Sequence, residues 1–282
     1  MQARNLLWLL VLLLAIESLV GEFYRTVPLT VLHLTILLSF AFAHGALRYG
    51  TRGIIAFAVI CLVVSNLLEN LGVATGFPFG PYHYTDALGP KLGYVPLMIG
   101  PAYLGVGYLS WVLAGILIGD VNRRSDGWQI LATPIIGAFI MVMWDFAMDP
   151  MASTLAQWWI WHQGGGYFGV PLQNFLGWYL TVFAFMLIFA IYLRNYGPEE
   201  AAAQPKGYYL QAIAMYAVVA LDFVASYLVK SSEQATDATG MTWRSGDIYE
   251  TSALAALLAM MFVVVLATLK VAREPDETLS RI

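Results

Sequence analysis

Residues 54–69 read Ile54-Ile-Ala-Phe-Ala-Val-Ile-Cys-Leu-Val-Val-Ser-Asn-Leu-Leu-Glu69. No charged residue interrupts this run before Glu69, and the apolar stretch around it covers residues 53–74. A helix of about 20 such residues crosses the hydrocarbon core of a bilayer. Cys61 lies in the middle of the run, where we expect a packing residue. The stretch therefore predicts a membrane-spanning helix that carries a carboxyl group near its end.

The composition extends this interpretation to the whole chain of 282 residues. Hydrophobic residues make up 60% of it and charged residues 11%, against roughly 25% charged residues in soluble domains. So low a charge excludes a disordered chain and a nucleic-acid-binding protein, and the net charge of −4 is too small to indicate a charged partner. A single cysteine excludes a disulfide framework and a multi-cysteine metal site. We predict an all-α, polytopic membrane protein.

Eight apolar stretches are long enough to span the bilayer, and a count of seven is the alternative. They cover residues 5–24, 27–47, 53–74, 93–119, 127–149, 171–193, 208–229 and 250–270. Most of the 14 Lys and Arg residues fall in segments on one side of these spans, which predicts that both ends of the chain lie in the cytoplasm (N-in, C-in). We expect one membrane domain over 1–282, in the inner or plasma membrane, with 271–282 as a cytoplasmic tail.

Two connections on the predicted outer side are rich in Gly, Pro and aromatic residues. The first, 75–92, contains Gly76-Phe-Pro-Phe-Gly-Pro-Tyr-His-Tyr-Thr85, and the second, 150–170, contains Trp158-Trp-Ile-Trp-His162. Gly and Pro prevent a continuous helix, and non-helical backbone at the membrane must be buried in protein or line a cavity. We expect both loops to fold inward as a lid over a site, with a short interfacial helix over 151–163.

Acidic residues lie at one predicted depth beneath these loops. Charge inside a bilayer is costly, so each acid needs a partner or a function. Asp145 and Asp149 are one helical turn apart, so their carboxyl groups can approach each other, and at least one is expected to be neutral near pH 7. Glu69 and Asp222 are at the same depth. The structural alternatives are that Asp149 ends a helix before Pro150, and that Glu69 and Asp222 tie neighbouring helices together.

The sequence indicates neither a metal site nor a bound cofactor. The chain has four histidines, His33, His44, His83 and His162, and none is spaced from another as metal ligands on one helix would be. A hard cation held by carboxylates stays open as an alternative. Phosphate-binding loops and dinucleotide fingerprints are missing, because the glycines gather in the predicted outer loops.

Three motifs together resemble one known family. They are Glu69-Asn-Leu-Gly-Val-Ala-Thr-Gly-Phe-Pro-Phe-Gly-Pro-Tyr-His-Tyr84, then Asp145 with Asp149-Pro150, then Tyr167-Phe-Gly-Val-Pro-Leu-Gln-Asn-Phe-Leu-Gly-Trp178. This combination is similar to the transmembrane carotenoid-biosynthesis family, and the resemblance covers roughly residues 60–195. Characterised members of that family are hydratases of the bisanhydrobacterioruberin and γ-carotene types.

The resemblance implies a hydratase that adds water across the terminal double bond of an acyclic carotenoid end group, without a redox cofactor. From the chemistry of such an addition, we assign Asp145 and Asp149 to the acid/base pair, with Glu69 and Asp222 as alternates or water-orienting groups. The carbocation intermediate needs aromatic faces around it. The expected substrate-binding residues are Tyr82, His83, Tyr84, Tyr167, Phe168, Asn174 and Trp178.

Other functions use some of the same features. A carotenoid cyclase starts from the same proton-initiated cation, and only the group that captures the cation differs. A transporter also places acids within helices, but the inner half of this chain is nearly free of acids. A carotenoid-binding scaffold would not need several buried acids. The expected partners are a carotenoid taken from the lipid and neighbouring enzymes of its pathway; the oligomeric state stays open.

Overall fold

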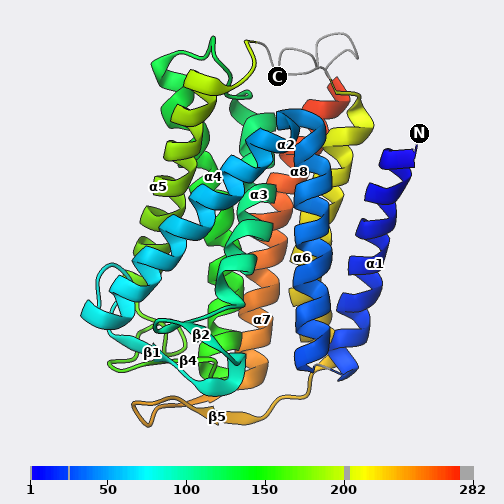
Figure 1. Cartoon of the computed structure of the whole chain (residues 1–282). Coiled ribbons are helices and arrows are strands. Elements are labelled where there is room, and N and C mark those ends of the chain that lie inside the picture. Colours follow the sequence, from blue (N-terminus) through cyan, green and yellow to red (C-terminus); the bar gives the residue numbers. More distant parts are fainter. Residues whose placement is uncertain (1, 25, 200–203, 274–282) are drawn as a thin grey trace.

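The computed structural model describes residues 2–24, 26–199 and 204–273, and within them the chain is a bundle of membrane-length helices (Figure 1). Seven helical segments are long and apolar enough to cross a membrane, which confirms the predicted all-α, multi-pass membrane protein. The helices are α1 (Gln2–Tyr24), α2 (Val27–Thr75), α3 (Ile99–Ile118), α4 (Gly127–Asp149), α5 (Leu172–Tyr196), α6 (Lys206–Val229), α7 (Ser245–Ala255) and α8 (Met261–Arg273).

Helix α2 contains two of the eight predicted spans. It is bent at Gly50, whose backbone is non-helical with φ 65° and ψ 172°. The limb before Gly50 and the limb after it match the predicted spans 27–47 and 53–74, and Figure 1 shows the second limb turning back down the bundle. Because only glycine adopts these dihedral angles without strain, one residue reverses the chain without a loop.

Two other spans include a π-helical turn. Pro150–Leu155 continues α4 in this form, and Ala256–Met260 joins α7 to α8, so that Ser245–Arg273 forms one span. Helix α3 is the most enclosed element, since it packs against α2, α4, α6 and α8. The core around it is filled by large side chains, among them Tyr103, Trp111 and Phe185.

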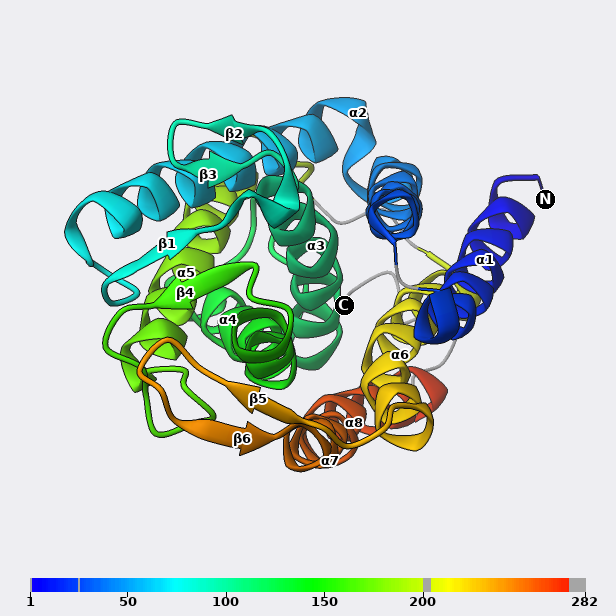
Figure 2. The ribbon, with the colours of Figure 1, turned by 90° about the horizontal axis from the view of Figure 1, so that it is seen from below.

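Three two-stranded antiparallel sheets lie together at one end of the bundle (Figure 2). They are β1 (Tyr82–Tyr84) with β4 (Trp159–Trp161), β2 (Lys91–Leu92) with β3 (Val95–Pro96), and β5 (Gln234–Thr236) with β6 (Thr242–Arg244). The predicted interfacial helix over 151–163 is therefore wrong beyond Leu155. Its backbone forms a strand because β1, from the other predicted outer loop, lies alongside and supplies hydrogen-bond partners.

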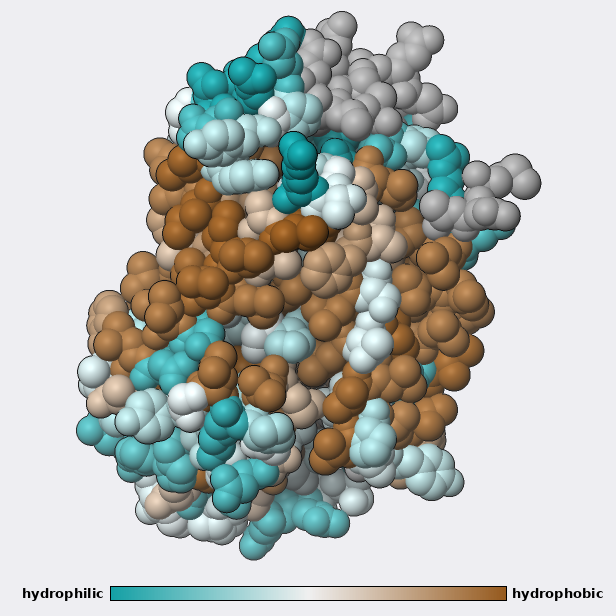
Figure 3. All heavy atoms as spheres, in the orientation of Figure 1, coloured by the Kyte–Doolittle hydropathy of each residue, from teal (hydrophilic) through white to brown (hydrophobic). Residues whose placement is uncertain are grey.

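The start of α1 and the end of α8 lie at the opposite end of the bundle from the sheets, as an even number of crossings requires. A broad apolar belt separates two polar ends (Figure 3), and exposed side chains such as Leu12, Leu19 and Leu258 contribute to the apolar surface. Which end faces the cytoplasm stays a prediction. Of the predicted cytoplasmic tail, residues 274–282 lie outside the described residues.

Buried charges near the two ends of the bundle are paired. Arg48 contacts Asp120 near the end where α1 begins. Toward the sheets, Glu22 of α1 accepts a hydrogen bond from Ser226 of α6 at 2.7 Å, and Lys230 Nζ lies 3.5 Å from the Glu22 Oε2 atom. These pairs tie helices together and offset the cost of placing charge in a low-dielectric region.

A Gly50→Ala variant tests the origin of the α2 bend. An added Cβ would meet no atom within 4 Å, so the expected loss comes from backbone strain alone, about 1–3 kcal/mol of unfolding free energy. Thermal unfolding in detergent measures it. Gly207→Ala is the matched control, because that position has open space and no positive φ. Equal stability of the two variants would contradict this account.

Candidate active site

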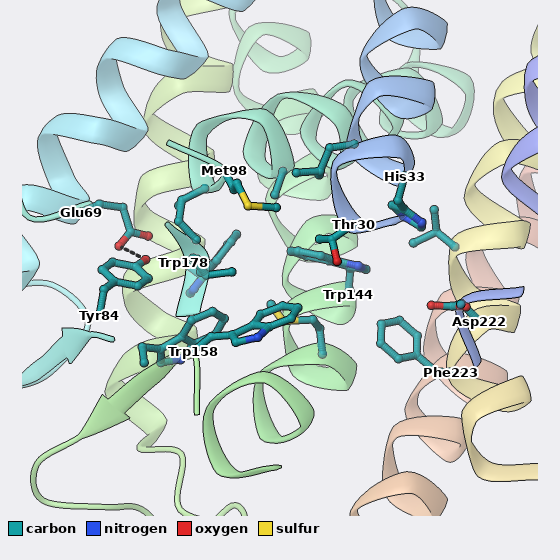
Figure 4. Close-up of a pocket in the computed structure, with 18 of the residues that line it drawn as sticks. Thr30, His33, Glu69, Tyr84, Met98, Trp144, Trp158, Trp178, Asp222 and Phe223 are labelled. Carbon is teal, nitrogen blue, oxygen red and sulfur yellow. Dashed lines mark hydrogen bonds between the residues drawn. The ribbon is translucent and has the colours of Figure 1, made fainter. Parts of the chain in front are cut away.

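An elongated cavity lies at the sheet end of the bundle, between the helices and the β1–β4 sheet. Residues from α1 to α6 line it together with both strands. Figure 4 shows polar groups at its two ends and large apolar side chains between them. Those intervening side chains include Met98, Trp144, Trp158 and Trp178. The cavity is therefore suited to a long apolar molecule.

One end of the cavity is formed around the carboxyl group of Glu69, which is 2% exposed. Tyr103 donates a hydrogen bond to its Oε1 atom at 2.7 Å, and Tyr84 donates to its Oε2 atom at 2.9 Å. Tyr82 also donates to Oε2. Three phenol groups thus converge on one carboxyl group from α3 and β1, and such donors stabilise its charged form.

The β1 strand explains how two of these tyrosines reach Glu69. Side chains alternate between the two faces of a strand, so Tyr82 and Tyr84 are buried and His83 between them is exposed. Across the sheet Tyr82 pairs with Trp161 and Tyr84 with Trp159. Burial against the cavity raises the pKa values of both tyrosines well above the usual range, so both hydroxyls stay protonated and donate.

A glycine in α5 lets the first loop pack closely on the bundle. A Cβ at Gly177 would lie 2.9 Å from the backbone carbon of Pro78 and 3.0 Å from the Cα of Phe79. Neither backbone atom can move away cheaply, so a larger residue would push the loop off α5. Because this loop continues into β1, Gly177 helps to place Tyr82 and Tyr84.

Asp145 and Asp149 form a second group of carboxyls beside Glu69, and both side chains are fully buried. The Asn174 Nδ2 atom donates to Asp145 Oδ2 at 3.2 Å and also to Asp149 Oδ2. Trp159 donates to Asp149 Oδ1 at 2.9 Å. Within the described part of the chain, Asp145 Oδ1 has no hydrogen-bond partner. Asp145 therefore differs from Asp149, both of whose carboxylate oxygens accept hydrogen bonds.

The aspartate pair lies behind the cavity wall. Asn174 and Trp159 line the cavity, whereas Asp145 and Asp149 do not. The three acids are still close enough for Asp145 to interact electrostatically with both Asp149 and Glu69.

The predicted single group of acids is divided in the structure. Asp222, from α6, lines the other end of the cavity, away from Glu69 (Figure 4). At that end His33 of α2 hydrogen-bonds to Glu17 of α1 at 2.6 Å. Residues at the same depth on different helices need not touch each other. Asp222 lies away from Glu69 because α6 packs against α1 on the far side of α3.

The predicted substrate-binding residues also separate into two sets. Tyr82, Tyr84, Asn174 and Trp178 line the cavity, and His83, Tyr167 and Phe168 do not. The second set forms other contacts, since His83 hydrogen-bonds to His162 at 2.8 Å, Tyr167 stacks on Phe146 and Phe168 contacts Trp243. Their roles in binding stay predictions.

Sequence reasoning missed several residues of the site. Tyr103 both donates to Glu69 and stacks on Trp178, with ring centroids 4.2 Å apart. It lies in an apolar helix, and no sequence motif links it to Glu69. Trp144 and Trp158 were likewise not singled out as lining residues. Over the described residues, no group of three or more His, Cys, Asp or Glu side chains is arranged to hold a metal ion.

The chain is similar in sequence to known proteins. The profile of a family described as "Carotenoid biosynthesis protein" matches residues 26–239, most of the chain. A bisanhydrobacterioruberin hydratase of Haloarcula japonica is 32% identical over 123 residues, which are 43% of this chain and 40% of that protein. The match thus spans less than half of either sequence. No solved structure matches the chain significantly.

The His83–His162 contact on the outer face of the β1–β4 sheet predicts a pH effect. Partial burial lowers the pKa of His83, and its neighbours His162 and Lys91 act in the same direction. Because its pKa in the folded state lies below the unfolded value of about 6.5, its contribution to stability is present above that pH and declines as the pH falls toward the folded value. We expect lower protection factors at the β1 amides at pH 5 than at pH 7, where a protection factor is the exchange rate of the unfolded chain at that pH divided by the observed rate. In His83→Gln this loss of protection should shrink, and an unchanged loss would contradict the assignment.

Proposed function

This chain belongs to the carotenoid biosynthesis protein family, and we propose that it is a carotenoid hydratase that adds water across the terminal double bond of an acyclic end group. The observation that carries the proposal is the cavity itself: an aromatic passage, of a kind that suits a polyene, ends at the buried carboxyl group of Glu69. The partial match to a hydratase supports the same reaction.

Hydration of such an alkene begins with proton transfer to carbon. The proton bonds to the less substituted carbon, the π bond breaks, and a tertiary carbocation remains. Water then forms the new C–O bond and loses a proton, so that the net change is the addition of one water without electron transfer. The protein must supply an acid, shield the cation and accept the last proton.

Glu69 is the carboxyl group best placed to exchange this proton, because it lines the cavity. The tyrosine hydroxyls around it stabilise the carboxylate that forms as the proton leaves, so they stabilise the charge that develops in the transition state. The same carboxylate then takes the proton from the attacking water and returns to its starting state. In this proposal Glu69, and not the predicted pair Asp145 and Asp149, exchanges the proton with the substrate.

Asp145 and Asp149 keep an essential role in this proposal. Their shared donor, Asn174, uses its Nδ2 group to bind both carboxyl groups. Its carbonyl oxygen is then the part of the amide that can accept a hydrogen bond from water in the cavity.

The aromatic side chains shield the cation. Trp178 is held flat against Tyr103, and Trp144 approaches Trp178 edge-on with ring centroids 5.9 Å apart. Aromatic faces attract a positive charge and exclude water until the end group is in place. In this proposal the polyene enters from the lipid of the cytoplasmic membrane, and neighbouring pathway enzymes supply it.

Pigment analysis tests the reaction. A host that makes acyclic and monocyclic carotenoids, given this chain, should accumulate a pigment heavier by one water than its precursor, as measured by mass spectrometry. A new pigment of the same mass as its precursor would indicate cyclisation instead of hydration. Absence of any new pigment, with the protein folded in the membrane, would contradict both enzymatic functions.

Three variants test the proposed roles in the same host. Glu69→Gln should lower the rate of hydration at least about 100-fold, since it removes general acid–base catalysis. Asp145→Asn and Asp149→Asn should also lose product at an unchanged protein level. Asp86→Asn is the matched control, because that carboxylate is exposed and paired with Lys91. Full activity of Glu69→Gln would refute its assignment as the acid.

A further inference from the structure

A second, smaller pocket lies at the sheet end of the bundle, between the β5–β6 hairpin and the loop that carries β4. Its lining runs from the exposed residues Gln157 and Ala238 to the buried Trp161, which also lines the large cavity. Strand β5 contacts the π-helical turn Pro150–Leu155, and Figure 2 shows the hairpin beside this loop. Trp161 is therefore a wall that the pocket and the cavity share.

The shared wall lies next to the proposed acid. Trp161 contacts Tyr82, with ring centroids 4.9 Å apart, and Tyr82 donates a hydrogen bond to Glu69. A small molecule that passes from the pocket beyond Trp161 thus arrives at the Glu69 end of the cavity. The aromatic passage extends from that end in the other direction (Figure 4).

The pocket has a polar lining, although it borders an apolar core. Ser153 donates a hydrogen bond to the backbone oxygen of Asp149 at 2.9 Å, and Thr154 donates to the backbone oxygen of Phe168. A hydroxyl that donates one hydrogen bond can still accept another, so both can bind a small polar molecule. The polar residues of the lining are Ser153, Thr154, Gln157 and Asp237.

The backbone around this pocket is strained. Gln157 has φ 50° and Phe168 has φ 49°, and these two are the non-glycine residues with positive φ in the described part of the chain. Gln157 lines the pocket, and the carbonyl group of Phe168 is held by Thr154, which also lines it. Backbone strain of this kind gathers at functional sites. The strain therefore supports a role for the pocket beyond packing.

Hydration requires a route for its second substrate. Glu69 gives one proton to carbon and takes one from the attacking water, so each turnover consumes one polyene and one water. A polyene that fills the aromatic passage excludes water from it. Water therefore has to reach the cation from another side.

We propose that the pocket beneath the β5–β6 hairpin admits water to the site, with Trp161 as the wall that separates it from the cavity. The inference rests on the proposed function, because hydration is the reaction that consumes water. The polyene then enters from the lipid, and water enters from the polar sheet end of the bundle (Figure 3). A shift of the Trp161 side chain joins the two spaces and brings water to Glu69, the carboxyl group that accepts its proton.

Thiol chemistry at the mouth of the pocket tests this inference. Ala238→Cys places a thiol on an exposed lining residue, and the natural Cys61 is buried. Purified protein in detergent is treated with a bulky methanethiosulfonate, which forms a mixed disulfide with the new thiol. The rate of hydration, measured from pigment mass, should fall at least about tenfold, because entry of water then limits turnover. The affinity for the polyene, measured by quenching of tryptophan fluorescence, should stay unchanged.

Gln234→Cys is the matched control, because Gln234 is exposed on the same hairpin and lies outside the pocket. Its labelled form should hydrate at the unlabelled rate. Removal of the label by a reductant should restore hydration in Ala238→Cys, which shows that the protein stayed folded.

Three results would overturn the inference: undiminished hydration in labelled Ala238→Cys, an equal loss in labelled Gln234→Cys, or a loss of polyene affinity on labelling. Failure of the proposed function looks different. In that case unlabelled wild type and unlabelled Ala238→Cys bind the polyene and form no hydrated pigment, and the inference falls with the function.

Discussion

The structure depends on the burial of carboxyl groups within a membrane bundle. A carboxylate in hydrocarbon is costly unless it is hydrogen-bonded or keeps its proton. Glu69 has three tyrosine donors, and Asp149 has a tryptophan and an asparagine. These donors come from α3, α5 and both strands of the β1–β4 sheet. The arrangement of helices and loops around the cavity therefore follows from the need to satisfy these acids.

The loops contribute to the site because they are not helical. A strand shows alternate side chains to opposite faces, so β1 directs two tyrosines inward while its exposed histidine contacts His162 on the outer face. Pairing with β4 adds Trp159 and Trp161 to the same wall. A membrane helix could not place alternate residues in this way. The Gly/Pro-rich composition, which breaks the helices, makes such a wall possible at the end of the bundle.

Much of the fold was predictable from the sequence, and the site was predictable only in part. Apolar length identified the spans, and Glu69, Asp145 and Asp149 were recognised as unusual because they interrupt apolar runs. The depth of a residue along its helix could be estimated from the sequence, but the direction in which its side chain points around the helix axis could not. For that reason Asp222 was grouped with Glu69, which lies at the other end of the cavity, and Tyr103 was not recognised at all.

By itself, the sequence determined that this chain crosses a membrane many times, where Gly and Pro interrupt its helices, and that it belongs with carotenoid-biosynthesis proteins. These properties follow from composition and local motifs, which act over a few residues. Only the tertiary structure decided which acids share one cluster, which aromatic side chains face the cavity, and that the cavity has two polar ends. Those features depend on how distant helices pack, because contacts between side chains far apart in the chain are set by helix rotation and register rather than by spacing in the sequence.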